Sequence, residues 1–317
     1  MSQVNDEKRI FFDIQIPGTH DTGSFNFMKN CPFPSFDSSC LVQRTFKHFQ
    51  PYIVTQALDI GEQLEMGIRY FDLRLLDSNF QLYHGPMPLK FNFQNDVISK
   101  IKHFLFKHKT ETVLVKIKLQ GHIKRHSDTF RNGMEKLFVN PKFNNLFWFP
   151  TPADLIHKER ENNKHPTLGE VRGKIVLILD GLKFNQEDKT KYIPYEGFLH
   201  KGNNKEWSKD FKISNVASLK TKKSHLNDSI AQLNTNDKQA PNLIQLSGTC
   251  LDGIKSLNDL KRLFKRCEYT PQKVAMELNK YYVDLNIKSK LGFIVTVDFP
   301  SQELIKKIIN GNEGVNV

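Results

Sequence analysis

The feature that most constrains the fold is an alternation of short apolar segments with longer amphipathic ones. Several of the short segments are continuous apolar runs, which is typical of strands that are buried on both faces. The amphipathic segment 95–108 has its apolar residues at helical spacing, and four others resemble it. The predicted strands are 11–16, 68–76, 80–85, 112–119, 174–179, 242–248 and 292–299, and the predicted helices are 95–108, 128–139, 256–267, 270–285 and 301–310.

Strands that alternate with helices form parallel βαβ units. In a chain of 317 residues, this order predicts an α/β fold, either a (β/α) barrel or an open doubly wound sheet. The sequence has no G-x-G-x-x-G motif and no Walker loop, so it does not favour dinucleotide binding. The polar, Lys/Asn-rich segment 183–240 is predicted to form long loops with short helices. We expect a single domain over 1–317, with its motifs between about 11 and 310.

The chain has a formal net charge of +12, which attracts a protein to polyanions. Nucleic acid and an anionic membrane surface are both candidates, and a lysine-rich solvated surface explains the charge equally well. The sequence shows neither zinc-finger spacing nor the aromatic signature of an RNA-binding module, so no nucleic-acid partner is expected. It also gives no sign of an obligate protein partner.

The start of the chain is polar, and no apolar run approaches the length of a membrane-spanning helix. We therefore expect a soluble protein without a signal peptide. It would be cytoplasmic or exported without a classical signal, and peripheral at membranes. The four cysteines form no C-x-x-C motif. Cys31 and Cys40 could close a small loop, but free thiols in a reducing compartment are the favoured interpretation.

An aromatic cluster, Phe147, Trp148 and Phe149, lies in the segment "NLFWFP". On a loop, such a cluster could insert into a membrane interface. Ordinary core packing is the alternative, and it is slightly favoured.

Polar residues collect at one end of successive predicted strands, which is the end that holds the chemistry in a barrel. Each has an ordinary explanation as a helix cap, an ion pair or a solvated side chain, but their common placement favours an active site. The segment "IPGTHD" also contains Pro17 and Gly18, which predict a turn before the first of these residues. The set is His20 and Asp21 after the first strand, Asp72 and Arg74 in the second, His84 after the third, Lys116 and Lys118 in the fourth, and Asp298 after the last.

Two histidines and an arginine suit phosphoryl transfer. One neutral imidazole takes a proton from an attacking hydroxyl, and a second, protonated imidazole gives one to the leaving oxygen. A neighbouring carboxylate fixes the imidazole tautomer. The arginine offers a charge-assisted fork to phosphate oxygens.

At these residues, the sequence resembles the X domain of phosphatidylinositol-specific phospholipases C, most strongly the bacterial, metal-independent kind. The blocks keep the order and approximate spacing of the family over about 16–300. They are "IPGTHDTGSF", "GIRYFDLRL", "LYHGP", "TETVLVKIKL", "VRGKIVLIL" and "FIVTVDF".

The resemblance implies a distorted TIM barrel that cleaves an inositol phospholipid. The 2-hydroxyl of the substrate would attack phosphorus, release diacylglycerol and leave a cyclic phosphodiester. His20 would be the general base and His84 the general acid. Asp298 would orient His20, Asp21 would assist His84, and Arg74 would bind the phosphate.

The head-group contacts depart from the family pattern. The substrate-binding candidates are Asp72, Lys118, Lys116 and Asp180. The bacterial enzymes have an arginine that grips the inositol where this chain has Asp180, and their ring-holding Asp and Tyr find no match around 205–220, where Trp207 and Phe211 are the nearby aromatics. Phosphatidylinositol is the default substrate, and a phosphorylated or glycosylated variant is the alternative. Lys201, Lys205 and Lys209 would be suited to bind the extra phosphates of a phosphorylated head group.

The resemblance also bears on metals. Eukaryotic relatives hold Ca²⁺ with carboxylates at the positions of Asp72 and Arg74. A guanidinium cannot ligate Ca²⁺, which requires oxygen ligands, so we expect no metal and no cofactor. Two alternatives stay open: a catalytically inactive lipid-binding barrel, and a metal-dependent enzyme of the glycerophosphodiesterase type.

Overall fold

The fold is taken from a computed structural model of the chain. The structure describes residues 1, 3–25, 51–76, 79–84, 87–121, 124, 126–150, 166–195, 211–233, 241–249, 267–287, 289 and 291–312.

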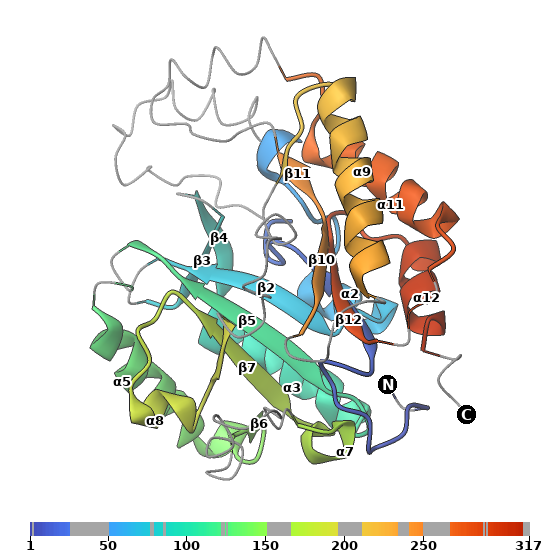
Figure 1. The fold of residues 1–317 in the computed structure, drawn as a ribbon. Helices are drawn as coiled ribbons and strands as arrows, with labels where there is room; N and C mark the ends of the chain where they lie inside the picture. The colour runs from blue at the N-terminus through green and yellow to red at the C-terminus, as the bar shows by residue number, and fades with distance from the viewer. Residues whose placement is uncertain are drawn as a thin grey trace, which may run out of the picture.

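A parallel sheet with helices packed against it forms the centre of the molecule (Figure 1). Its strand order is β10-β12-β1-β2-β5-β7-β6. These strands are β10 (Leu243–Leu246), β12 (Phe293–Val297), β1 (Gln15–Thr19), β2 (Tyr70–Leu75), β5 (Val113–Leu119), β7 (Ile175–Asp180) and β6 (Phe147–Trp148). The short strand β8 (Ile193–Pro194) also pairs with β7, and the antiparallel hairpin β3 (Gln81–His84) and β4 (Met87–Asn92) joins β2. A separate pair consists of β9 (Phe211–Lys212) and β11 (Gly248–Thr249).

Helices connect the strands and cover the outer face of the sheet (Figure 1). The helices are α2 (Ile60–Met66), α3 (Ile98–Lys107), α5 (Ser127–Phe138), α7 (Leu168–Val171), α8 (Gln186–Lys189), α9 (Val216–Leu233), α11 (Pro271–Asp284) and α12 (Gln302–Asn310). A π-helical turn, η1 (Phe93–Val97), precedes α3, and a 3₁₀ turn, η2 (Pro141–Phe143), follows α5. The predicted alternation of parallel strands and helices is therefore confirmed. The predicted helix 256–267 lies almost wholly outside the described residues.

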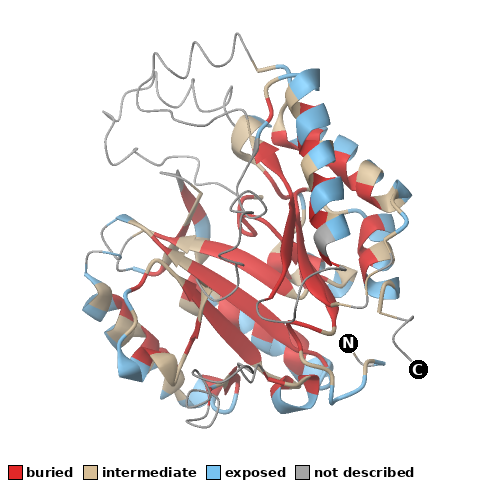
Figure 2. Ribbon diagram, in the orientation of Figure 1, coloured by how far each residue is buried: buried red, intermediate tan, exposed pale blue. Residues whose placement is uncertain are grey.

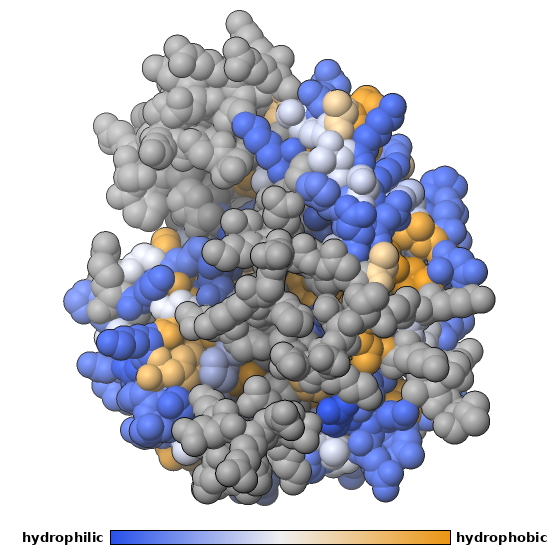
Figure 3. All heavy atoms as spheres, in the orientation of Figure 1, coloured by the Kyte–Doolittle hydropathy of each residue, from blue (hydrophilic) through white to orange (hydrophobic). Residues whose placement is uncertain are grey.

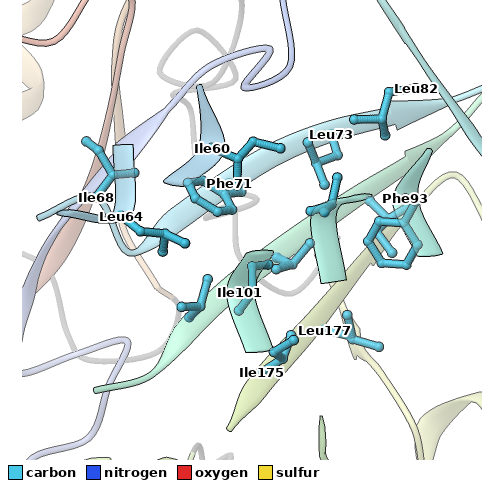
Figure 4. Packing of buried hydrophobic residues seen from close by; sticks show 14 of the residues in the cluster. Ile60, Leu64, Ile68, Phe71, Leu73, Leu82, Phe93, Ile101, Ile175 and Leu177 are labelled. Atoms are coloured by element: carbon cyan, nitrogen blue, oxygen red, sulfur yellow. The ribbon is translucent and has the colours of Figure 1, made fainter. Parts of the chain in front are cut away.

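Alternate residues of the strands point to opposite faces of the sheet, and the two faces have separate apolar cores. The outer core lies between the sheet and helices such as α2 and α3 (Figure 4). It includes Ile60, Leu64, Phe71, Leu73, Ile101, Ile175 and Leu177. Burial colours most of the strand surface red and only one side of each helix, which is the pattern of amphipathic helices on a buried sheet (Figure 2). Hydrophilic side chains predominate on the visible outer faces of α5 and α9 (Figure 3).

The inner face of the sheet changes character along the strands. At the amino ends it is apolar, with Ile16, Tyr70, Leu114, Val176, Leu243 and Ile294 in one buried cluster. Two to four residues further along the same strands, the inner positions hold Asp72, Arg74, Lys116, Lys118, Asp180, His20 and Asp298. The fold therefore places an apolar floor beneath a polar mouth, as the barrel interpretation requires.

The first strand differs from its prediction. Strand β1 begins at Gln15 rather than at residue 11, and it pairs with β12 from that point. Residues 10–13 form turns instead, and Phe11 and Phe12 are buried in the inner cluster. The apolar run 11–16 thus contains core side chains from a turn as well as the start of a strand.

Gly18 also has a different role from the predicted turn. It lies inside β1 and pairs with Tyr70 of β2. A Cβ atom at Gly18 would lie 2.8 Å from the Tyr70 Cβ, closer than real contacts allow. Glycine is therefore required because the two strands approach each other closely at this point.

The segment 183–240 was predicted to contain only short helices, and this is wrong for α9, which has 18 residues. The buried side of α9 explains the error, because it repeats every three or four residues but mixes apolar and polar types. Lys222 and Ser229 are as buried as Leu219 and Leu226. The buried residues are Leu219, Lys222, Leu226, Ser229 and Leu233.

Candidate active site

The carboxyl ends of the strands bring together the five residues that were predicted to be catalytic. His20 and Asp21 follow β1, and Asp298 follows β12, the parallel neighbour of β1. Arg74 lies in β2, the strand on the other side of β1, and His84 ends β3. The site thus draws on four strands, from β1 near the start of the chain to β12 near its end.

His20 is held by its ring and by its backbone. Its Nδ1 lies 3.0 Å from Asp298 Oδ1, and its Nε2 lies 3.3 Å from Arg74 Nη2. The guanidinium of Arg74 can only donate, so this contact fits the neutral ring that carries its proton on Nδ1, directed at Asp298. The same Nε2 lies 3.2 Å from the Asp21 carboxylate, a contact that fits the protonated ring. Gln56 Nε2 donates to the His20 carbonyl at 2.8 Å, and this ties the residue to the segment before α2. His20 is consequently a fixed, buried imidazole whose Nε2 faces both Arg74 and Asp21.

Asp21 is the hub of the cluster. Its Oδ2 lies 2.9 Å from Arg74 Nη2, 3.0 Å from His84 Nε2 and 3.2 Å from His20 Nε2. Its Oδ1 lies 2.5 Å from Arg74 Nε in an ion pair whose angles do not meet hydrogen-bond geometry. The residue has φ 42°, a backbone conformation that Asp tolerates better than most residues and that turns its side chain into the cluster.

The charge on Asp21 follows from these neighbours. Burial alone would raise the pKa of this carboxyl, but Arg74, His20 and His84 outweigh burial and hold the pKa well below its usual range. Asp21 is therefore ionised at neutral pH. The resemblance assigned it to His84 alone, and the structure adds contacts to Arg74 and His20.

A second cluster lies beside the first, on β2, β5 and β7. Lys116 Nζ lies 3.2 Å from Asp72 Oδ1 and 3.9 Å from Asp180 Oδ2, and it sits 4.2 Å from the ring centroid of Tyr195. Burial would lower the pKa of Lys116, but Asp72, Tyr195 and Asp180 raise it above its ordinary value. Lys118, two residues on, is half-buried and has Arg74 and Asp180 as its strand neighbours.

Several supporting residues were not predicted. Thr22 and Asp72 exchange two hydrogen bonds, with Thr22 N donating to Asp72 O and Asp72 N donating to Thr22 Oγ1. Asn279 Nδ2 donates to the Asp298 carbonyl at 3.0 Å. Thr22 stands in the "IPGTHDTGSF" block, so the sequence offered a signal for it. Asn279 and Tyr195 lie in segments without a motif, and only the three-dimensional contacts identify them.

The three residues of the aromatic cluster 147–149 differ in how far they are buried. Phe147 is buried in the outer core, and Trp148 is half-buried against the inner one. Phe149 is 41% exposed, and its ring centroid lies 5.1 Å from that of Phe138 at the end of α5. Core packing is therefore the better description of this segment. Across the described ranges, no helix has both the length and the apolar character needed to cross a membrane.

The remaining expectations concern the cysteines, the region around 201–211 and the absence of a metal site. Cys267 is disulfide-bonded, so the expectation of free thiols is wrong for this residue. The other three cysteines lie outside the described residues, as do Trp207, Lys201, Lys205, Lys209 and the side chain of Phe211. Among the residues that the structure describes, no group of three or more His, Cys, Asp or Glu side chains is arranged to hold a metal ion.

The fold and the site define a class: an α/β barrel of the TIM type with two histidines, an arginine and buried carboxylates at the carboxyl ends of its strands. Residues 39–179 match the model of the family "Phosphatidylinositol-specific phospholipase C, X domain". A 1-phosphatidylinositol phosphodiesterase of Listeria monocytogenes is 28% identical over 307 residues, which cover 95% of this chain and 80% of the relative. One from Staphylococcus aureus (strain Newman) is 28% identical over 186 residues, 56% of this chain and 49% of the relative.

Solved structures agree with these matches. A phosphatidylinositol-specific phospholipase C from L. monocytogenes superposes with a TM-score of 0.66 at 23% identity and covers 98% of this chain and 97% of its own. One from S. aureus gives a TM-score of 0.64 at 22% identity, with 98% and 96% covered. Over residues 39–179 the chain is therefore similar to the phosphatidylinositol-specific phospholipase C X domain, and its sequence and structural relatives include bacterial phospholipases of this type.

Proposed function

We propose that the protein is a metal-independent phospholipase C that cleaves an inositol phospholipid into diacylglycerol and a cyclic inositol phosphate. The observation that carries the proposal is the continuous chain of contacts from Asp298 through His20 and Arg74 to Asp21 and His84. The bacterial relatives, named 1-phosphatidylinositol phosphodiesterases, support this reaction class, a phosphoric diester hydrolase or lyase. The proposal takes 1–317 as one catalytic unit that acts at an anionic membrane surface.

In this mechanism, His20 is the general base. Its Nε2 removes the proton of the 2-hydroxyl of the inositol ring, and the oxygen attacks phosphorus. The imidazolium that forms lies between Asp298 and Asp21, whose carboxylates stabilise its positive charge. Fixing the ring in this way removes the reorganisation that a mobile imidazole would require.

Arg74 and His84 act on the phosphate. The guanidinium of Arg74 binds the non-bridging oxygens as negative charge develops on them. His84 gives a proton to the glycerol oxygen, so that this oxygen leaves as the hydroxyl of diacylglycerol while the P–O bond breaks. The ionised Asp21, 3.0 Å from the His84 ring, orients the ring and stabilises its cationic form.

The charges of the site are consistent with a metal-independent reaction. The carboxylates of Asp21 and Asp72 already face Arg74 and Lys116. A cationic side chain therefore occupies the place beside each carboxylate that a metal ion would take. Asp72, Lys118, Lys116 and Asp180 form the adjoining wall, which we assign to the head group. Hydroxyls of the ring would donate to the carboxylates and accept from the ammonium of Lys118.

The test is diacylglycerol release from phosphatidylinositol vesicles in EDTA, with ³¹P NMR to detect the cyclic phosphodiester. His20→Ala and His84→Ala should each lower kcat by about 10²–10⁴. His103→Ala, on the exposed side of α3, is the matched control.

Three results would contradict the proposal. Full activity in either histidine variant would remove the acid–base assignment. Activity that EDTA abolishes and Mg²⁺ restores would indicate the metal-dependent alternative. Vesicle binding without turnover of any phospholipid would indicate a lipid-binding barrel.

A further inference from the structure

Lys116 differs from the other candidate substrate-binding residues in its surroundings. Its side chain is 8% exposed, close to the 11% of Asp72 and well below the 22% of Asp180. Its ammonium lies between the carboxylates of Asp72 and Asp180, with the ring of Tyr195 on a further side. The carboxylate of Asp180, and not the ammonium of Lys116, is therefore the group that reaches the mouth.

The register of the strands explains how one lysine reaches two carboxylates. Lys116 is paired with Asp72 on β2. Asp180 on β7 is paired with Lys118, the next inward-facing residue of β5 toward the carboxyl end. The lysine side chain extends toward the mouth and stops below Asp180. Among the described residues, the other titratable groups at this level are the phenols of Tyr70 and Tyr195, and burial raises the pKa of both, so they are neutral.

Two carboxylates that share one buried cation are held in place by it. Without the cation, their like charges would repel each other. The raised pKa of Lys116 reflects the same attraction from the other side, because Asp72 and Asp180 stabilise its charged form. Lys118 and Arg74 lie at the next level, toward the phosphate side of the mouth.

We propose that Lys116 is a positioning residue and not a ligand of the substrate. It holds the carboxylates of Asp72 and Asp180 in place and balances their charge, so that their oxygens accept hydrogen bonds from the hydroxyls of a polyol head group. This inference rests on the proposed function for its substrate, but not for the charge pairing itself. Lys116 touches none of the groups assigned to proton transfer, so its removal should raise KM and change kcat little.

The first experiment needs no turnover: Tm is measured at pH 5 and pH 8 for the wild type, Lys116→Met and Lys116→Met/Asp180→Asn. In Lys116→Met the two carboxylates lose the cation that lies between them, so their negative charges repel each other. The loss of Tm should be larger at pH 8 than at pH 5, because this repulsion requires both groups to be charged. The double variant has one carboxylate, and this difference between the two pH values should become smaller. An equal loss at both pH values, or no recovery in the double variant, would overturn the charge pairing.

The second experiment measures KM and kcat on phosphatidylinositol vesicles in EDTA. Lys116→Met should raise KM at pH 8 about tenfold, a loss of about 1.4 kcal/mol of binding free energy, with kcat within about threefold. Lys116→Arg should restore most of the loss, since it keeps the buried charge. Lys107→Met, an exposed lysine at the end of α3, controls for the change in net charge. A fall in kcat with unchanged KM would overturn the positioning role. If the wild type has no activity, the proposed function fails, while the Tm measurement still decides the role of Lys116.

Discussion

Two arginines near the same strand pair with buried carboxylates, at opposite ends of the barrel. Arg74, in β2, lies 2.9 Å from Asp21 at the carboxyl end. Arg69, directly before β2, lies 2.8 Å from Glu111 at the amino end. Both carboxylates have a lowered pKa, because in each case the cations outweigh burial. Residue types, distances and charge states are thus nearly the same.

The partners beyond each ion pair differ. Arg69 donates further hydrogen bonds to the carbonyls of Leu64 and Ile68 and lies over the ring of Phe104, and Glu111 also accepts from the N-terminal ammonium of Met1. Asp21 instead meets His20 and His84, and histidine is the side-chain type suited to proton transfer near neutral pH. A buried ion pair becomes a candidate active site when its other neighbours are histidines at the mouth, and it remains structural when they are main-chain groups at the amino ends of the strands.

The largest expected difference between the two ion pairs is the effect of replacing each arginine by methionine. Arg74→Met should lower kcat by about 10²–10³, because the developing charge on phosphate loses its donor. Arg69→Met should lower Tm and leave kcat of the folded fraction unchanged. The measurement is diacylglycerol release per folded molecule, with the folded fraction taken from circular dichroism. Equal kcat losses in the two variants would remove the distinction between the two ends.

Asp298→Asn should lower kcat by about 10², since His20 would lose the partner that sets its tautomer. Asp188→Asn is the control, because Asp188 is also buried and is held by Arg131 at 2.9 and 2.7 Å on the outer side of the barrel. This control should lose stability only. If kcat survives in Asp298→Asn, another residue must orient His20.

The sequence predicted which of these residues lie near one another better than it predicted the contacts between them. In "YFDLRL" the period of two places Asp72 and Arg74 on one face, and the family blocks supplied His20, His84 and Asp298. These are local patterns. The contacts of Asp21 with three side chains depend on a left-handed backbone and on strands far apart in the chain. The reach of Lys116 to Asp180, and the polar buried side of α9, depend likewise on packing that local periodicity does not encode.

The pH dependence of the free energy of unfolding tests the structural role of the Glu111–Arg69 ion pair. Glu111 has a pKa lowered from 4.5, so its stabilisation is present above that value and is lost as pH falls through its lower folded pKa. Glu111→Gln should reduce the free energy of unfolding at pH 7 by about 3 kcal/mol, because Arg69 is left without its counter-ion. The difference from wild type should shrink below pH 4.5, where the wild-type carboxylate also loses its charge. Urea titrations from pH 3 to pH 7 measure this, and a loss independent of pH would contradict the ion-pair assignment.

Phe149→Ser should have the smallest effect, and it tests whether membrane contact belongs to the end of the barrel that holds the site. Strand β6 pairs with the first two residues of β7, and Phe149 continues from it to pack against Phe138, away from Asp180 at the far end of β7. We therefore expect vesicle binding and turnover within about twofold of wild type, as for an ordinary surface substitution. Phe147→Ser, in the buried core beside it, should lower Tm by several degrees, because a large apolar side chain is lost. Vesicle sedimentation decides the question. A large loss of binding in Phe149→Ser alone would show that this aromatic side chain contacts the membrane from the side of the barrel, so that the mouth is not the sole contact.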